Sequence, residues 1–380
     1  MIPLKLTLRF GTIWMLILCL YVQGTLALCE CGYRVHYGGD AAQYPRTILY
    51  TEALHVNFRA LHDFADSKDW KIKYVRFNYD PSSGRYGKRV AAENIVPNPV
   101  ANPNQGWDSA SKQGPDVDSG LQLIVRSQIT NGLVSVAQIQ SKRDDAQFGS
   151  FRTFMKTTSI SGTCASHFWY NSDSKEIDME MLSRQQGVKQ SNPYPANLVV
   201  HSDASVAEGN DARNTAGFIE GKMGVVPSDE FHEYRYDWSE NLVSFYLDGS
   251  WMGDLNQSVP AVPGVFQISH WSDGNPNWTA GPPAQDAILT VAYFMGYFNS
   301  TDAKRNREYN ALCGGGQGDD KICDVPDYKG MANSGGEGPM FVGVSQNETG
   351  ERHNSASQFK GSVATPLVIF CAIIAIFIAM

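Results

Sequence analysis

Short apolar runs recur along most of the chain, separated by clusters of glycine, asparagine, aspartate and serine. The runs lie at 121–126, 133–140, 164–170, 176–182, 197–201, 232–238, 242–247 and 288–294. Short runs at even spacing are typical of strands in a sandwich or barrel. The stretch 51–64 has the most helix-like pattern, and the chain has no internal repeat. The pattern therefore predicts an all-β fold.

Composition changes this picture at two places. Residues 84–119 are rich in proline, asparagine, glycine and serine, which predicts a long surface loop. Residues 300–362 contain few apolar runs, and we expect a flexible stalk from about residue 327 to residue 354. With 42% hydrophobic residues the chain can form a sizeable core. A net charge of −8 without a basic run argues against a nucleic-acid partner.

The N-terminal segment has the pattern of a secretory signal peptide. Residues 1–27 carry Lys5 and Arg9, an apolar run from Ile13 to Val22, and small residues before Leu28. An N-terminal membrane anchor is the alternative, but the run is shorter than the roughly 20 residues that a span needs. We therefore expect the mature chain to begin near Leu28 and to be secreted.

The C-terminal segment has the pattern of a GPI-attachment signal. Small residues at 354–357 precede a polar spacer and the apolar tail 365–380, with no charge after it. We expect attachment at Asn354 or Ser355, removal of 355–380, and anchoring to the outer face of the plasma membrane or to the cell wall. A tail-anchored helix is the alternative, for which the tail is slightly short.

The cysteines fit an oxidising compartment. Five lie outside the terminal segments: Cys29, Cys31, Cys164, Cys313 and Cys323. Cys29 and Cys31 are too close to pair with each other. We expect two disulfides that either join the N-terminal pair to the C-terminal segment or close 313–323 locally, with Cys164 a buried free thiol. A zinc site is the weaker alternative because no Cys-x-x-Cys spacing is present.

Four Asn-x-Ser/Thr sequons support secretion and predict glycosylation. They begin at Asn256, Asn277, Asn299 and Asn347.

The segment 176–181 alternates carboxylates with apolar residues. In a strand, successive side chains point to opposite faces, so Glu176, Asp178 and Glu180 share one face. Ile177, Met179 and Met181 then point into the core. Three carboxylates in a row repel each other. The arrangement therefore indicates a chemical role, with an exposed polar strand or a calcium site as the alternatives.

The preceding strand, 164–170, ends in a turn-forming cluster at 171–174. A hairpin centred on that cluster pairs residues whose numbers sum to 345. This register places Trp169 opposite Glu176 and His167 opposite Asp178. An aromatic platform beside paired acids is typical of a sugar site.

Paired carboxylates suit glycoside hydrolysis, in which one acts as nucleophile and the other as general acid and then base. Positions i and i+4 of a flat strand lie about 13 Å apart at Cα. The two Glu side chains must therefore lean toward each other over a curved sheet. Asp178 between them would orient the nucleophile and separate their pKa values.

Several motifs in chain order resemble glycoside hydrolase family 16. Glu176–Glu180 is similar to its E-[ILV]-D-x-E signature. Further matches are FGSFR at 148–152, FHEYRYDW at 231–238, VSFYLDG at 243–249, HWSDGNPNW at 270–278 and GPP at 281–283. The resemblance covers roughly 45–300. It implies a concanavalin A-like β-jelly roll with a concave substrate cleft, and a catalytic domain over 28–326.

The resemblance also implies roles for the site residues. Glu176 is expected to be the nucleophile, Asp178 the assisting acid and Glu180 the acid/base. The expected sugar-binding residues are Trp169, Trp271, Trp278, His167, His201 and His270, although the tryptophans could be core aromatics and the histidines structural. The five-residue form, without an extra residue in the motif, occurs in lichenases, xyloglucan transglycosylases and chitin–glucan transglycosylases of the family.

Together these features predict a GPI-anchored, retaining, endo-acting β-glucan hydrolase of the cell wall. The alternatives are a transglycosylase that joins β-glucan or chitin chains and a non-catalytic glycan-binding jelly roll. We expect a monomer that requires no cofactor, and a structural calcium ion remains compatible with the sequence.

Overall fold

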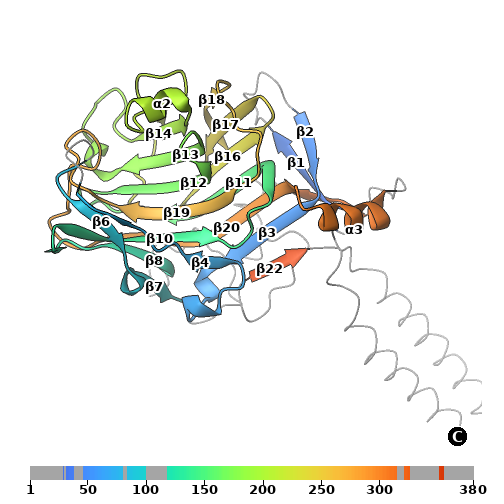
Figure 1. Cartoon of the computed structure of the whole chain (residues 1–380), viewed down its shortest axis with the longest axis horizontal. Helices are drawn as coiled ribbons and strands as arrows, with labels where there is room; N and C mark the ends of the chain where they lie inside the picture. The colour runs from blue at the N-terminus through green and yellow to red at the C-terminus, as the bar shows by residue number, and fades with distance from the viewer. Residues whose placement is uncertain are drawn as a thin grey trace, which may run out of the picture.

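The computed structural model describes residues 29, 31–37, 46–79, 84–99, 118–314, 321–325 and 351–354 (Figure 1). The predicted signal peptide, the apolar tail and Asn347 lie outside these residues. Among the described residues, none of the helices has both the length and the apolar character that a membrane crossing needs.

Two large sheets pack face to face. The first has the order β15-β14-β13-β12-β19-β10-β6-β5, and β4 and β9 also pair with β10. Its strands are β15 (Phe218–Lys222), β14 (Pro195–Val200), β13 (Lys175–Leu182), β12 (Cys164–Ser172), β19 (Val265–Trp271), β10 (Leu133–Ser141), β6 (Gly87–Val90), β5 (Arg76–Phe77), β4 (Trp70–Ile72) and β9 (Ile129–Thr130).

The second sheet has the order β18-β17-β16-β11-β20-β3-β22, extended by β8 beside β20 and by β7 beside β8. Its strands are β18 (Ser250–Leu255), β17 (Leu242–Leu247), β16 (His232–Ser239), β11 (Ala146–Lys156), β20 (Ala287–Ser300), β3 (Glu52–Asn57), β22 (Glu351–Asn354), β8 (Gly120–Val125) and β7 (Ile95–Asn98). The two-sheet arrangement confirms the predicted all-β jelly-roll sandwich.

The core lies between the sheets and is rich in aromatic rings. Phe151 of β11 packs on Phe266 of β19 with ring centroids 4.4 Å apart, and Trp169 of β12 packs on Trp238 of β16 at 4.5 Å. All four side chains are fully buried. Burying such large apolar surfaces is the main force that holds the sheets together.

Two predictions of local structure were wrong. The stretch 51–64 forms β3 followed by the short 3₁₀ turns η1 (Phe58–Ala60) and η2 (Phe64–Asp66). Strand β3 is buried on both faces, so its apolar residues do not alternate as in a half-exposed strand. The loop predicted over 84–119 contains β6, η3 (Ala92–Asn94) and β7 in its first part, and residues 100–117 of it lie outside the described residues. These short strands form because they pair with β10 and β8.

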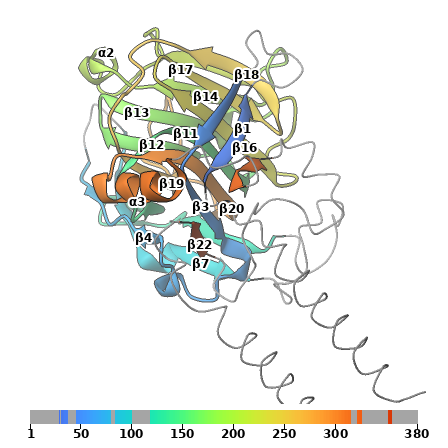
Figure 2. The same cartoon turned by 90° about the vertical axis from the view of Figure 1, so that its right-hand side faces the viewer.

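A third, small sheet covers the outer face of the second one. It has the order β2-β1-β21, with β1 at Tyr33–Tyr37, β2 at Arg46–Tyr50 and β21 at Cys323–Val325. Tyr33 and Tyr50 of this sheet pack in one buried cluster with Phe154 of β11 and Tyr297 of β20. Figure 2 shows β1 and α3 (Ala303–Cys313) from the side on which they lie.

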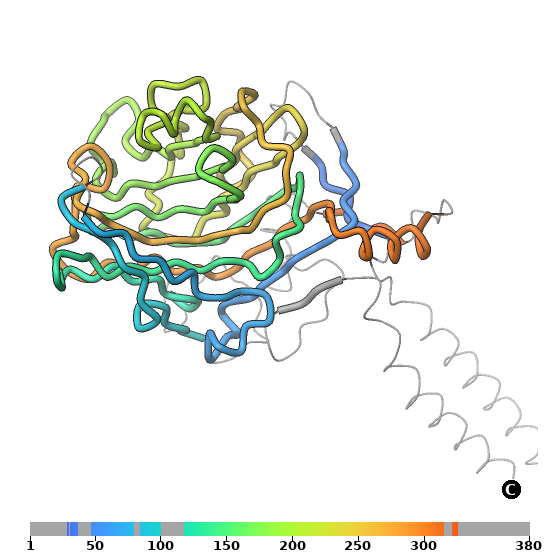
Figure 3. Tube along the Cα trace, in the orientation of Figure 1, coloured from blue at the N-terminus to red at the C-terminus, as the bar shows by residue number. Residues whose placement is uncertain are grey.

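Two disulfides join the ends of the described chain. Cys29 pairs with Cys323 and Cys31 pairs with Cys313, which confirms the pairing between the N-terminal and C-terminal segments over local closure. Cys164 is free and buried, as predicted. Figure 3 shows the blue N-terminal strands beside the orange helix that follows β20.

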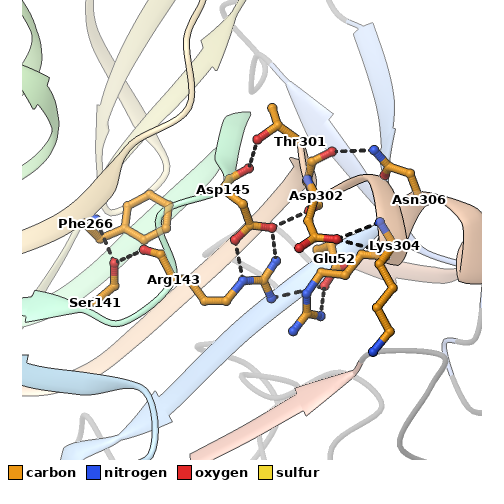
Figure 4. A network of polar contacts seen from close by, with 11 residues as sticks. Glu52, Ser141, Arg143, Asp145, Phe266, Thr301, Asp302, Lys304 and Asn306 are labelled. Carbon is orange, nitrogen blue, oxygen red and sulfur yellow. Dashed lines mark hydrogen bonds and ion pairs between the residues drawn. The ribbon is translucent and has the colours of Figure 1, made fainter.

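A polar network fixes the start of helix α3. Arg143 donates to Asp145 Oδ1 at 2.6 Å and to Glu52 Oε2 at 3.2 Å (Figure 4). Arg305, in the first turns of α3, donates to the same Glu52 oxygen at 3.1 Å. Asp302 caps α3 by accepting from the backbone N–H groups of residues 304 and 305. The network therefore ties the disulfide-bonded segment to the second sheet.

The sequons of the described residues differ in accessibility. Asn256 and Asn277 are exposed. Asn299 is half-buried in β20, and its side-chain oxygen accepts a hydrogen bond from the Thr51 N–H. Asn299 is therefore the least accessible of these three predicted glycosylation sites.

Candidate active site

The acidic residues lie in the hairpin formed by β12 and β13. Tyr170 pairs with Glu176, Phe168 with Asp178 and Ser166 with Glu180. The register shifts between Tyr170 and Ser172, so Asn171 is an extra residue of a β-bulge. The predicted pairs of Trp169 with Glu176 and His167 with Asp178 were therefore wrong. One extra residue transfers every side chain of β12 to the opposite face.

This one-residue shift in register places Trp169 and His167 in the core. Trp169 is fully buried against Trp238. The His167 Nδ1 atom lies 2.9 Å from Thr153 Oγ1, and burial lowers the pKa of His167 to about 3. A neutral, buried imidazole on the core side of the sheet cannot contact a sugar in the cleft. The prediction that these two residues bind substrate was wrong.

His270 is also a structural residue. Its Nδ1 donates to the Leu123 carbonyl at 2.8 Å, and its Nε2 lies 2.9 Å from Thr163 Oγ1. The ring is fully buried, and burial lowers the pKa of His270 to about 4. The expected sugar contact of His270 was therefore wrong, because β19 turns this residue toward the core.

A cleft of about 940 Å³ runs across the outer face of the first sheet. Alternate residues of β13, β12 and β19 form its floor, and segments 207–213 and 273–278 contribute walls. Among the lining residues are Phe77, Lys88, Ser166, Phe168, Tyr170, Glu176, Asp178, Glu180, His201, Arg213, Gln267, Ser269, Trp271, Asp273 and Trp278. All three carboxylates of β13 lie in this cleft with His201, Trp271 and Trp278.

A side-chain hydrogen bond joins Glu176 and Asp178. Burial is the main cause that raises the pKa of both carboxyl groups, that of Glu176 to about 8, and mutual repulsion within the acidic strand adds to it. The hydrogen bond lowers the pKa of Glu176 and raises that of Asp178. Asp178 is only 4% exposed. Of the two carboxyl groups, Asp178 therefore holds its proton more tightly.

Glu180 has different neighbours. Burial raises its pKa, while a hydrogen bond from the Cys164 thiol and the charge of Lys88 lower it. The Cys164 Sγ atom lies 3.4 Å from Glu180 Oε1. The site thus places two carboxyl groups of different environment on either side of Asp178, as an acid and a nucleophile require.

His201 completes the Glu176 end of the site. Its backbone N–H donates to the Glu176 carbonyl at 3.0 Å, and its Nε2 atom lies 3.4 Å from Asp178 Oδ2. Ligand atoms of Glu176, Asp178 and His201 lie within 4.8 Å of one another, which is close enough to hold a metal ion. Within the part of the chain that the structure describes, these three residues form the group in the cleft that could bind a cation.

Each cleft tryptophan has a cationic neighbour. The Lys88 ammonium lies 3.7 Å from the ring centroid of Trp271 and 5.3 Å from that of Phe77. The Arg213 guanidinium lies 5.6 Å from the ring of Trp278. Sequence reasoning missed these cations, because Lys88 falls in the proline- and glycine-rich stretch and Arg213 reaches the cleft from a loop.

Comparison with known proteins finds a family match over part of the chain. Residues 102–288, which include strand β13, match the family description "Glycosyl hydrolases family 16". This part of the chain is therefore similar to glycosyl hydrolase family 16. The match spans the complete acidic strand and both hairpin partners.

Two curated relatives match part of the chain. A β-glucanase of Bacillus amyloliquefaciens is 26% identical over 156 residues, which are 40% of this chain and 59% of that protein. Congo red hypersensitive protein 1 of Saccharomyces cerevisiae is 24% identical over 160 residues, 41% of this chain and 27% of that protein. The chain thus spans less than two thirds of either relative.

A solved structure titled Bacillus licheniformis β-glucanase superposes with a TM-score of 0.46 at 15% identity. The superposition covers 64% of this chain and 97% of the β-glucanase chain.

Proposed function

We propose that this protein is a retaining, endo-acting β-glucan hydrolase of the cell wall. The observation that carries the proposal is the acidic face of β13. Glu176 and Glu180 lie on either side of Asp178 in an open cleft of a family 16 domain, and a hydrogen bond joins Asp178 to Glu176. The names of the β-glucanase relatives support the substrate class.

In the first step the Glu176 carboxylate attacks the anomeric carbon. As the new C–O bond forms, Glu180 transfers its proton to the glycosidic oxygen, and the bond to the leaving sugar breaks. Asp178 stabilises the ionised nucleophile by its hydrogen bond. The product of this step is a glycosyl ester on Glu176 and a free chain end.

In the second step Glu180, now ionised, takes a proton from water. The oxygen attacks the anomeric carbon, the ester bond breaks and the Glu176 carboxylate leaves. This double displacement retains the configuration. If the hydroxyl group of a second sugar replaces the water, the same intermediate gives transglycosylation.

Trp271, Trp278 and His201 are the proposed substrate contacts. Trp271 and Trp278 are half-buried in the cleft, so part of each ring is accessible to a sugar. The chemistry requires no cofactor. We also propose that the protein is a monomer and that its fold is compatible with a structural calcium ion.

We also propose secretion and attachment to the membrane. The two disulfides support folding in an oxidising compartment. The catalytic domain would comprise 28–326, followed by residues 327–354, of which the last four form β22, and by the removable segment 355–380.

The test uses the purified secreted chain with laminarin, lichenan and a labelled oligosaccharide acceptor. We expect new reducing ends, with β-configured product at early times. Glu176→Gln and Glu180→Gln should each lose at least 10³-fold in kcat. Glu240→Gln, which changes an exposed carboxyl outside the cleft, is the matched control.

Labelled longer products without new reducing ends would assign transfer instead of hydrolysis. Glucan binding without turnover by the wild-type chain would favour the non-catalytic module. If Glu176→Gln had wild-type activity, the proposed nucleophile would be wrong.

A further inference from the structure

One of the predicted glycosylation sites lies in the wall of the cleft. Of the three sequons whose asparagines the structure describes, only that of Asn277 contributes residues to the cleft lining. Asn277 is exposed, whereas Asn299 is half-buried in β20. Asn256 is also exposed, but it follows β18 of the second sheet. A glycan on Asn277 would therefore stand beside the substrate, and a glycan on Asn256 would not.

The segment that carries Asn277 lies on the Glu180 side of the cleft. It follows β19, whose last residue, Trp271, pairs with Cys164. Cys164 pairs in turn with Leu182, two residues beyond Glu180 on β13. The segment therefore borders the acidic strand near its C-terminal end.

The cleft itself runs across the strands. Its lining extends from Phe218 of β15 to Phe77 of β5, the two edge strands of the first sheet. A glucan chain that follows the cleft thus crosses β13 instead of running along it. Asn277, displaced along the strand direction, flanks the path of this chain.

The backbone at Asn277 is fixed by hydrogen bonds. Its carbonyl accepts from Arg184 Nη2 at 2.8 Å and from Arg213 Nη1 at 3.3 Å. Its N–H donates to Asn275 Oδ1 at 2.9 Å, and the Asn275 N–H donates to Asp273 Oδ1 at 3.0 Å. A group attached to the Asn277 side chain would therefore project from a fixed point of the wall.

The sequon combines an open asparagine with a hidden threonine. Thr279 is fully buried, and its hydroxyl donates to Asp273 Oδ1 at 3.0 Å. Attachment must therefore precede folding of this segment. In that step the Asn277 amide nitrogen attacks C1 of a lipid diphosphate-linked oligosaccharide. The N–C bond forms, the C–O bond to the diphosphate breaks, and one amide proton passes to solvent.

We propose that Asn277 carries an N-linked glycan and that this glycan makes the cleft select unbranched over branched glucan. An N-linked glycan is bulky and lies on the surface. At the flank of the cleft it obstructs a side branch that points toward it, while an unbranched chain still passes. Selectivity can arise in this way from a clash with the rejected ligand, without a new contact to the preferred one. The inference rests on the proposed function, because it requires a glucan in the cleft.

Peptide mass spectrometry of the chain secreted by a eukaryotic host tests the modification. We expect a glycan on Asn277. An unmodified Asn277 would overturn the inference, whatever the activity of the protein.

Calorimetric titration tests the selectivity without turnover. The Glu176→Gln chain is titrated with a branched and with a linear β-glucan oligosaccharide of equal main-chain length. Adding Asn277→Gln or Asn277→Ala removes the attachment point, and each should tighten binding of the branched ligand about fivefold relative to the linear one, because the clash is lost. Asn256→Gln, which removes an exposed sequon outside the cleft lining, is the matched control and should keep the original ratio.

The possible outcomes separate this inference from the proposed function. An equal ratio with and without the Asn277 glycan would overturn the selectivity. A change in only one of the two Asn277 variants would assign the effect to the substituted side chain and would also overturn it. Glycan-dependent binding by a wild-type chain that neither cleaves nor transfers glucan would contradict the proposed function and leave the inference standing. Binding of neither ligand would contradict both.

Discussion

The Nε2 atom of His201 lies 3.4 Å from Oδ2 of Asp178, while its Nδ1 lies 3.0 Å from the Ser205 hydroxyl. Burial lowers the pKa of His201, so the ring is neutral near pH 7. Asp178 is thus held between Glu176 and a fixed imidazole.

His201→Gln tests whether this imidazole supports catalysis. We expect kcat to fall about 10-fold with a smaller change in KM, because the variant loses one ring contact that orients Asp178. Steady-state kinetics on laminarin or lichenan checks this. His36→Gln changes an exposed histidine near Asp324 and should be neutral. Unchanged kcat in His201→Gln would mean that Asp178 needs no support from this side.

Asp178→Asn should stabilise the protein at high pH. The folded-state pKa of Asp178 is raised well above its ordinary value, mainly by burial. Its contribution to stability is therefore fully present below the unfolded-state pKa and is lost as pH rises through the folded-state pKa. Asparagine stays neutral and can still donate to Glu176.

Thermal unfolding at two pH values measures this effect. At pH 8 we expect the variant to be more stable by about 1–3 kcal/mol, and at pH 4 the difference should nearly disappear. A difference that is the same at both pH values would contradict the protonated state of Asp178. Activity should fall, because stability and catalysis oppose each other at such sites.

Trp169 and Trp271 should respond oppositely to truncation. Trp169→Ala removes a fully buried ring from the core and should destabilise the protein by about 3–5 kcal/mol. Trp271→Ala removes a half-buried cleft ring and should raise KM roughly tenfold, equivalent to about 1.4 kcal/mol, with a smaller effect on unfolding. Urea unfolding and steady-state kinetics on both variants distinguish these effects. An increase in KM for folded Trp169→Phe would contradict its place in the core.

The two disulfides should contribute strongly to stability. They join residues separated by 294 and 282 positions, and cross-links that close long loops restrict the unfolded chain most. Cys29→Ser with Cys323→Ser should cost about 2–5 kcal/mol of unfolding free energy. A reductant should lower the unfolding free energy of the wild-type protein in the same way. Equal stability with and without a reductant would contradict the prediction.

Much of the acidic strand could be predicted from the sequence. Alternation places Glu176, Asp178 and Glu180 on one face in any strand, whatever its partner. The even spacing of short apolar runs likewise predicts a sandwich, because each run is long enough for only one strand. The cysteine positions limited the disulfides to few pairings.

Only the tertiary structure decided what surrounds these carboxylates. The bulge at Asn171 turned Trp169 and His167 into the core, since one extra residue reverses the faces of a strand. Lys88 reached the cleft because β6 pairs with β10, and Trp278 entered the same cleft from the segment after β19, far along the chain from Glu180. The period of two along a strand is a local property and can be read from the sequence. Strand register, strand pairing and loop contacts depend on packing between residues far apart in the chain. That packing cannot be read from a local sequence pattern.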